Sequence, residues 1–367
     1  MADLKRNLMR SRWLALAEKM KESDTGALLL TDPSDVRWLT GYVGSNGVAL
    51  AITTGKPLLA TDSRYAEMAA NECPEVELVV TRELIEQLLL RLREKGANSI
   101  GVDPDSLSLA QFRLISAHPG MFGIQVREMA APLAKLRLRK DIHELEAMRQ
   151  AGRIAVEALE QLLPTIEIGQ SEVHLARTLE ALMGDAGAKD RAFPTIVAAG
   201  ESGGEPHHEP GTRELRAGDL LTIDFGATVE GYRSDVTRTF IVGAELEEWQ
   251  AEIHDAVRRA ARAGRAAAAP GVPTKEVDAA ARGIIAEAGF GEFFLHGVGH
   301  GIGLDVHEPP LLGSATKGKL HPATPFTVEP GIYLPGKGGV RIEDTCVLTD
   351  DGVEIFTPFP RKLLRVG

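Results

Sequence analysis

The most restrictive feature of this 367-residue sequence is a pair of strand-like segments in which acidic residues stand among apolar ones. Residues 219–225 and 235–242 have the composition of strands, and a turn is predicted near Glu230-Gly231. A reversal centred just before Glu230 would place Asp224 opposite Asp235, where paired Cβ atoms are about 4.5–5.5 Å apart. Two carboxylates that close repel each other unless a proton or a metal ion lies between them.

A second strand-like pair near the C-terminus repeats this arrangement. Residues 325–334 lead into Pro335-Gly336-Lys337-Gly338-Gly339, a strong turn signal, and residues 340–348 form the predicted return strand. A reversal centred on Gly336 would place Glu329 opposite Glu343. The sequence therefore predicts two hairpins, each with a pair of carboxylates in an apolar neighbourhood.

Residues 296–310, which lie between the two predicted hairpins in the sequence, are rich in glycine and histidine. Glycine stands at every second position from Gly297 to Gly303, so the backbone there can approach another group closely. Four carboxylates and a histidine form a ligand set suited to two divalent ions such as Mn²⁺, Co²⁺ or Zn²⁺. Two ions about 3.5–4 Å apart can hold a bridging water and lower its pKa towards neutrality.

Each of these motifs has another interpretation when it is taken alone. Asp224 could be a turn residue or lie on a solvated strand edge, and Asp-Phe-Gly also occurs in protein kinases, whose other motifs this sequence lacks. Ile302 stands where a dinucleotide-binding motif needs its third glycine, and Leu311 where a zinc-protease helix needs its second histidine. Five further histidines are predicted to be solvated on helices (His143, His174, His254) or to lie in loops (His118, His321).

Length and composition limit the class of protein. The length exceeds that of one typical domain, so two domains are expected. Apolar residues make up 44% and charged residues 25%, which excludes a disordered or fibrous chain. A net charge of −11 disfavours nucleic acid and membranes as partners. Two cysteines, Cys73 and Cys346, and no signal-like or membrane-spanning stretch predict a cytoplasmic protein.

The chain divides near residue 135 into two parts with different patterns. Alternating helices and strands predict a small α/β domain over residues 1–134. Its predicted helices cover 8–20 and 82–95, and its predicted strands cover 26–31, 48–52, 58–60 and 99–102. In the second part, a long helix capped by Asp141 and Glu144 precedes further helices at 172–183, 246–269 and 274–288. Residues 135–367 are therefore predicted to form an α+β domain with helices packed on an antiparallel sheet.

In their order and spacing, these motifs resemble those of the pita-bread metallopeptidases, which include Xaa-Pro aminopeptidases (aminopeptidase P), prolidases and methionine aminopeptidases. The matching motifs are Ile223-Asp224-Phe225-Gly226, Ser234-Asp235-Val236-Thr237-Arg238-Thr239, Gly299-His300-Gly301-Ile302-Gly303 with His307, Val328-Glu329-Pro330-Gly331-Ile332-Tyr333 and Arg341-Ile342-Glu343-Asp344. Residues 1–134, with Thr61-Asp62-Ser63-Arg64-Tyr65, resemble the creatinase-type N-terminal domain of the proline-specific members, which methionine aminopeptidases lack. The resemblance implies a pita-bread catalytic domain preceded by a smaller α/β creatinase-type domain.

The resemblance also implies a role for individual residues. The five metal ligands would be Asp224, Asp235, His300, Glu329 and Glu343, with Asp235 and Glu343 bridging both ions. Glu329 would also shuttle the proton of the attacking water, and His207 and His307 would assist catalysis. The pocket on the proline side would be lined by His296, Tyr333 and Arg341. His208 stands where relatives often have Gly or Tyr, and the spacing to Asp224 favours His207 as the histidine that points inward.

The function implied is hydrolysis of the bond between an N-terminal residue and proline, with two divalent ions, of which Mn²⁺ is expected. Peptides with proline in second place would be the substrates of an aminopeptidase P, and dipeptides alone those of a prolidase. Creatinase, which lacks the metals, and non-enzymatic relatives are less favoured because all five ligand positions carry ligand-type residues. Trp38 lies in a segment similar to one that reaches a neighbouring subunit's active site in relatives, so a homodimer is expected. The alternative is that Trp38 packs in its own domain.

Overall fold

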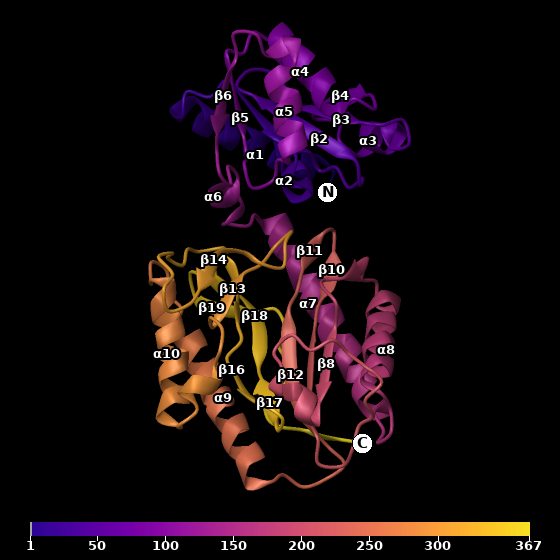
Figure 1. The fold of residues 1–367 in the computed structure, drawn as a ribbon, viewed down its shortest axis with the longest axis vertical. Helices are drawn as coiled ribbons and strands as arrows, with labels where there is room; N and C mark the ends of the chain where they lie inside the picture. The colour runs from indigo at the N-terminus through magenta and orange to yellow at the C-terminus, as the bar shows by residue number, and fades with distance from the viewer. Residues whose placement is uncertain (1) are drawn as a thin grey trace. The chain divides into compact units, whose positions relative to one another are not determined.

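The computed structural model describes residues 2–367, which form two compact units, one that ends at Arg137 and one that covers Leu138–Gly367. The division lies at residue 137, where the sequence placed it at residue 134. Figure 1 shows both units as mixtures of helices and strands. None of the helices in the described part of the chain has the length and apolar character that a membrane crossing requires.

The N-terminal unit is built on a six-stranded sheet with the order β4-β3-β2-β1-β5-β6. Strands β1, β2 and β3 pair antiparallel, and the other pairs are parallel, as expected of an α/β unit. The elements are α1 (Ala2–Glu22), β1 (Ala27–Leu30), α2 (Pro33–Thr40), β2 (Gly47–Ile52), β3 (Leu58–Thr61), α3 (Ala66–Glu72), β4 (Glu77–Val80), α4 (Leu84–Glu94), β5 (Ser99–Val102), α5 (Leu109–Ala117), β6 (Gln125–Glu128) and α6 (Ala134–Arg137). The helices and strands predicted for this part are confirmed, while α2, α3, α5, α6, β4 and β6 were not predicted.

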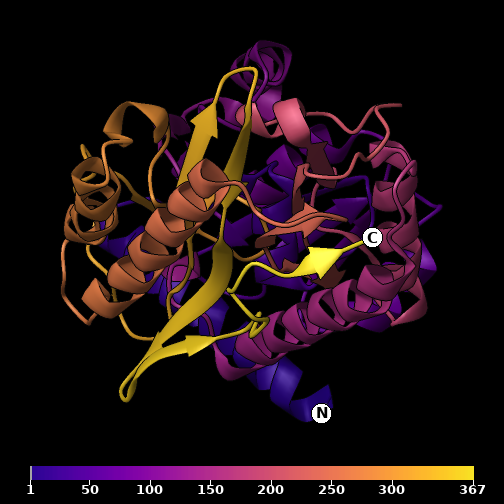
Figure 2. The ribbon, with the colours of Figure 1, turned by 90° about the horizontal axis from the view of Figure 1, so that it is seen from below.

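The C-terminal unit begins with the capped helix that the sequence predicted. Asp141 accepts hydrogen bonds from the backbone N–H groups of His143 and Glu144, and the Glu144 side chain accepts one from the Asp141 N–H. Its helices are α7 (Ile142–Leu162), α8 (Glu172–Asp185), α9 (Glu248–Ala267) and α10 (Thr274–Glu287). In Figure 1, α9 and α10 lie on one side of this unit's strands and α7 and α8 on the other, and Figure 2 shows the C-terminal strands between α9 and α7.

The sheet of this unit has nine strands, seven of which run in the order β14-β13-β15-β18-β12-β9-β8, with β19 and β20 attached to β18 and β12. Only the β12–β20 pair is parallel among its pairings. The strands of the unit are β7 (Asp190–Arg191), β8 (Ile196–Ala199), β9 (Leu220–Phe225), β10 (Ala227–Val229), β11 (Tyr232–Arg233), β12 (Val236–Val242), β13 (Gly299–Gly301), β14 (Glu308–Leu312), β15 (Pro325–Val328), β16 (Gly331–Leu334), β17 (Gly338–Arg341), β18 (Glu343–Thr349), β19 (Gly352–Ile355) and β20 (Arg365–Val366). The predicted α+β class with an antiparallel sheet is confirmed.

The reversal of the first hairpin is centred one residue later than predicted, which shifts the pairing by two residues. Asp224 pairs with Thr237 rather than with Asp235, because the reversal is centred between Glu230 and Gly231. Both of these turn residues have positive φ, 46° and 78°, as in the two-residue turns that fit the twist of a hairpin. The pairing partner moves by two residues, so Asp235 stays on the same face of the sheet as Asp224, diagonally across from it.

The second hairpin has the predicted reversal. Gly331 pairs with Arg341 and Leu334 with Gly338, on either side of Gly336, and β15 continues the same register with β18. The predicted strands are interrupted, however, because β16 and β17 form a separate two-stranded sheet. Glu329 lies at the break between β15 and β16, and Glu343 is the first residue of β18.

The prediction that His254 is solvated is wrong. His254 is one of the buried residues of α9, and only 7% of it is exposed. Burial, with a smaller contribution from the charge of Arg258, lowers its pKa to about 4. His174, by contrast, is exposed as predicted.

His254 is therefore expected to make the protein sensitive to acid. In the unfolded chain its pKa returns to about 6.5, so the unfolded state binds more protons between pH 6.5 and pH 4. The free energy of unfolding falls through this window as the pH is lowered, by about 3 kcal/mol in full. Urea unfolding at pH 7 and at pH 4 should show a smaller pH effect for His254→Gln than for the wild type. His174→Gln is the control, and equal pH effects in all three proteins would contradict this account.

Candidate metal centre

Three potential metal ligands meet at the centre of the C-terminal unit. The ligand atoms of Asp235, His300 and Glu343 all lie within 4.8 Å of one another, and all three residues are buried. Asp235 directly precedes β12, His300 is the middle residue of β13, and Glu343 begins β18. β12 and β18 are neighbours in the sheet, with Thr237 paired to Glu343, so the two hairpins meet at this point.

Glycines on both sides of His300 let β13 fit between its neighbours. A Cβ atom on Gly299 would collide with the Thr327 carbonyl oxygen, and one on Gly301 with the Pro309 carbonyl oxygen. The His300 imidazole donates from Nδ1 to the Gly301 carbonyl oxygen at 2.9 Å, which leaves Nε2 directed at the carboxylates. Burial lowers the pKa of His300, which favours the neutral form that binds metals.

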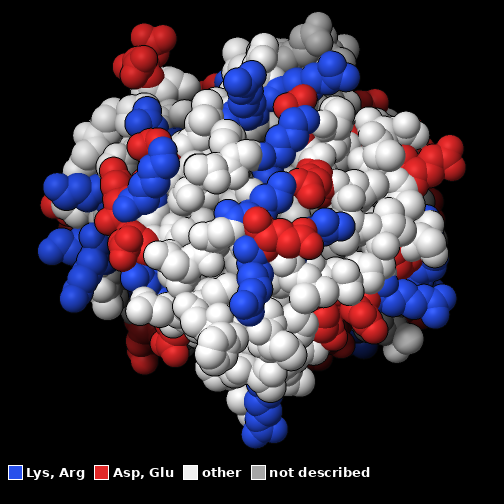
Figure 3. Space-filling model, turned by 90° about the horizontal axis from the view of Figure 1, so that it is seen from above, with Lys and Arg blue, Asp and Glu red and all other residues white. Residues whose placement is uncertain are grey.

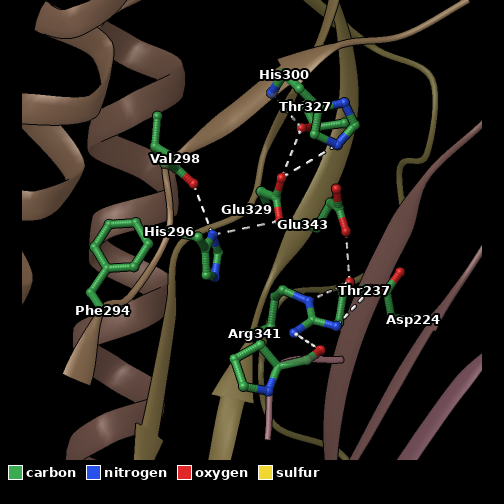
Figure 4. A network of polar contacts seen from close by, with 12 residues as sticks. Asp224, Thr237, Phe294, His296, Val298, His300, Thr327, Glu329, Arg341 and Glu343 are labelled. Atoms are coloured by element: carbon green, nitrogen blue, oxygen red, sulfur yellow. Dashed lines mark hydrogen bonds and ion pairs between the residues drawn. The ribbon is translucent and has the colours of Figure 1, made fainter. Parts of the chain in front are cut away.

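Asp224 and Glu329 line the same cavity as the three clustered residues. Glu329 Oε1 lies 3.4 Å from His300 Nε2 and accepts a 3.4 Å hydrogen bond from the Thr327 hydroxyl. Figure 4 shows Glu329 between His296 and His300 and Thr237 between Glu343 and Arg341. The structure thus brings together all five side chains that the sequence proposed as metal ligands.

Three carboxylate oxygens of this site, one on each of three residues, have no hydrogen-bond donor among the described residues. Asp224 Oδ1, Asp235 Oδ1 and Glu343 Oε1 are buried, and none has a hydrogen-bond partner among the described residues. Burial first, and then the neighbouring carboxylates, raise the pKa of Asp235 and of Glu343 well above the usual range. Unpaired buried acceptors are costly, and a divalent cation would satisfy them. The oxygen and nitrogen donors present therefore fit divalent ions of the Mn²⁺, Co²⁺ and Zn²⁺ kind.

The residues predicted to line the proline-side pocket form one hydrogen-bonded chain that ends on Asp224. His296 Nδ1 donates to the Gly297 carbonyl oxygen, and its Nε2 lies 2.8 Å from the Tyr333 hydroxyl. Arg341 donates to that hydroxyl at 2.8 Å and to Asp224 Oδ2 at 2.6 Å. His296 and Arg341 line the cavity, whereas Tyr333 is 2% exposed and is not among the residues that line it.

The two histidines predicted to assist catalysis lie at the cavity wall. His207 and His307 are both exposed and both line the cavity. The His307 ring meets the His300 ring edge to face, with centroids 4.4 Å apart. His208 also lines the cavity, but its Nε2 lies 2.8 Å from the buried carboxylate of Glu172.

The sequence analysis missed two sets of hydrogen bonds to the carboxylates at and behind the site. The Thr237 hydroxyl donates to Glu343 Oε2 at 2.6 Å. Thr237 follows Asp235 by two residues in a predicted strand, so the sequence could have placed both side chains on the same face of the sheet. Behind the hairpins, the buried Asp344 binds three guanidinium groups, those of Arg238, Arg265 and Arg361. These arginines are far apart in the sequence, and nothing local predicted their meeting.

The cavity itself has a volume of about 1080 Å³, which is ample for a short peptide. Part of its wall is apolar, formed by Phe193, Pro194, Ile196, Leu295, Leu311 and Leu312. Leu295 and Leu311 are 65% and 58% exposed, respectively. An apolar wall beside a cluster of carboxylates and imidazoles suits a ligand with both a hydrophobic side chain and a polar backbone.

Comparisons with known proteins agree with this geometry. Residues 146–350 match the model of metallopeptidase family M24, and residues 12–138 match the Creatinase/Prolidase N-terminal domain. The chain is 32% identical over 358 residues to the Xaa-Pro dipeptidase of Pyrococcus furiosus, covering 97% of this chain and 100% of that one.

Solved structures give the same result. An Xaa-Pro dipeptidase from Bacillus anthracis superposes with a TM-score of 0.93 at 34% identity, covering 98% of this chain and 100% of the other. An X-Pro aminopeptidase from Thermotoga maritima superposes with a TM-score of 0.89 at 34% identity, covering 96% and 99%. The predicted family and the predicted pita-bread fold with a creatinase-type N-terminal domain are confirmed. The chain therefore belongs to metallopeptidase family M24.

Proposed function

We propose that this peptidase cleaves the bond between an N-terminal residue and a following proline, in the manner of an aminopeptidase P. One observation carries the proposal. The carboxylates of Asp224, Asp235 and Glu343, each with one buried oxygen that has no hydrogen-bond partner among the described residues, line the same cavity as the His300 imidazole. The relatives named Xaa-Pro dipeptidase and X-Pro aminopeptidase support the choice of substrate.

In this proposal, Asp224, Asp235, His300, Glu329 and Glu343 would hold two divalent ions, with Mn²⁺ expected, and Asp235 and Glu343 would be ligands of both. Bound ions would supply a water of lowered pKa and polarise the scissile carbonyl. Glu329 would take the proton from the attacking water and pass it to the leaving nitrogen. His207 and His307, at the cavity wall, would donate hydrogen bonds to the substrate as charge develops on its carbonyl oxygen.

The proline preference is expected to come from the pocket beside His296, Tyr333 and Arg341. Proline fills such a pocket with a compact ring and loses little conformational entropy on binding. Alanine would lose about two methylene-sized contacts, on the order of 1.5 kcal/mol or about tenfold. We therefore expect kcat/KM for Ala-Pro-Xaa peptides to exceed that for Ala-Ala-Xaa peptides by at least about tenfold. Equal values would identify a general aminopeptidase and remove the proline assignment.

A strict dipeptidase is the second candidate, because several relatives carry the name Xaa-Pro dipeptidase. Both activities require the same metal ligands and the same proline pocket, so they differ only in the space beyond proline. The rates for Ala-Pro and for an Ala-Pro-Xaa tripeptide separate them. Cleavage of both would favour the aminopeptidase, and cleavage of Ala-Pro alone the dipeptidase.

The homodimer and the cytoplasmic location remain predictions. Trp38 is 4% exposed and lies under the Arg12 guanidinium within its own unit, which agrees with the alternative interpretation of this residue. The two cysteines on which the expected location is based, Cys73 and Cys346, are free thiols, and both are buried. On the face shown in Figure 3, basic and acidic side chains are interspersed. The mass in solution at micromolar concentration measures the oligomeric state.

A further inference from the structure

The segment that carries His207 is rich in glycine and needs anchors to hold a fixed position. Residues 200–211 follow β8 and include Gly200, Gly203, Gly204 and Gly211. Glycine loses more backbone freedom on ordering than any other residue. A catalytic side chain in such a segment therefore depends on contacts made by its neighbours.

One anchor lies on the N-terminal side of His207. The Pro206 carbonyl oxygen accepts a 3.3 Å hydrogen bond from Arg341 Nη1. Gly204 packs so closely on the backbone of Leu334 that a Cβ would lie 2.7 Å from its carbonyl oxygen. This side of the segment is thus held against the hairpin that carries Arg341.

The second anchor lies on the C-terminal side and is the carboxylate of Glu172, the first residue of α8. Glu172 is fully buried, and its Oε1 accepts the backbone N–H of Ala199 at 2.9 Å. Its Oε2 accepts the N–H of Gly211 at 3.1 Å and lies 2.8 Å from His208 Nε2. Because both oxygens already accept backbone donors, the contact with His208 is a hydrogen bond when Nε2 carries the proton. Glu172 thus ties together α8, the end of β8 and the segment with His207.

His207 lies between these two anchors, and its side chain makes no hydrogen bond with the described residues. His207 and His307 both line the same cavity. The direction of the His207 side chain is therefore set by the backbone of Pro206 and His208. The contact of His208 Nδ1 with Glu205, at 3.6 Å, adds little because the Glu205 side chain is 76% exposed.

We infer that Glu172 and His208 are positioning residues, which fix the Pro206–His208 turn so that His207 points into the cavity. The inference rests on the proposed function for the role of His207, but the anchoring itself does not. His208, although it lines the cavity, then acts through its neighbour and not on the substrate.

The test compares His208→Ala with His208→Gln in the full chain loaded with Mn²⁺. Gln has an amide N–H donor at about the reach of imidazole Nε2, so it can keep the bond to Glu172 but cannot transfer a proton. We expect His208→Ala to lower kcat for Ala-Pro by roughly 10–100-fold, the effect of displacing a reacting group by about 1 Å. KM and bound Mn²⁺ should stay within about twofold, and His208→Gln should retain most of the wild-type kcat.

Amide hydrogen exchange of residues 205–211 gives a second readout that does not need activity. His208→Ala should speed this exchange, while His208→Gln should not. The control is His174→Ala, at an exposed position on α8, the helix of Glu172, and it should also leave the exchange unchanged. Wild-type kcat in His208→Ala, or a Gln variant as impaired as the Ala variant, would overturn the inference. If His208→Ala does not fold, Glu172→Gln should give the same two effects. A wild type inactive on every Xaa-Pro peptide would defeat the proposed function, and exchange would still decide the anchoring.

Discussion

Removal of divalent ions with a chelator is expected to abolish peptide hydrolysis, and added Mn²⁺ or Co²⁺ should restore it. Without the ions, water in the site would keep its ordinary pKa and the scissile carbonyl would not be polarised, so Glu329 alone would be too weak a catalyst for peptide hydrolysis. The measurement is the rate on Ala-Pro alongside the metal content of the same sample. Full activity in a sample shown to be free of metal would contradict the proposal.

Substitution of the proposed ligands tests the same metal dependence, and Glu343→Ala should lower the affinity for metal more than Asp224→Ala does. Glu343 lies in the cluster with Asp235 and His300, and its loss would remove a ligand proposed for both ions. Titration of the metal-free protein with Mn²⁺ measures the affinity, and Glu245→Ala, whose side chain is 94% exposed, is the control. Two ions bound at wild-type affinity in Glu343→Ala would refute the ligand assignment.

His207→Ala and His307→Ala are expected to keep their bound metal and lose turnover. Both side chains line the cavity and are exposed, and neither belongs to the cluster of three ligand residues. Groups that donate hydrogen bonds or protons to a reacting substrate typically contribute about 10²–10⁴-fold, so kcat should fall by that range. The measurement is kcat for Ala-Pro with the Mn²⁺ content of each variant.

His174→Ala is the matched control for this second pair of variants, because His174 is exposed on α8 and is not among the residues that line the cavity. Its kcat should equal that of the wild type. Loss of metal in His307→Ala with metal retained in His300→Ala would reverse the assignment of ligand and catalyst. Unchanged kcat in His207→Ala would refute the proposed catalytic role of His207.

The sequence predicted the features that depend on neighbouring residues. The capped start of α7 follows from Asp141 and Glu144, three residues apart, and the reversal at Gly336 follows from a glycine-rich turn. Side chains alternate between the two faces along a strand. Asp224 and Asp235 therefore share a face even though the predicted pairing partner of Asp224 was wrong by two residues. The turn residues are Glu230 and Gly231, so the hairpin is centred one residue later than predicted. The identity of Glu230 gave no indication of its positive φ.

The sequence by itself thus determined which residues are the candidates for the chemistry, since carboxylates in apolar strands and glycines around His300 are local patterns. Only the tertiary structure decided how they meet, because pairing between β12 and β18 joins segments more than a hundred residues apart. The same holds for Glu172 beside His208, for the three arginines around Asp344 and for the burial of His254. Contacts of this kind depend on which helix covers which face of the sheet, and the spacing of residues within one segment contains no information about that choice.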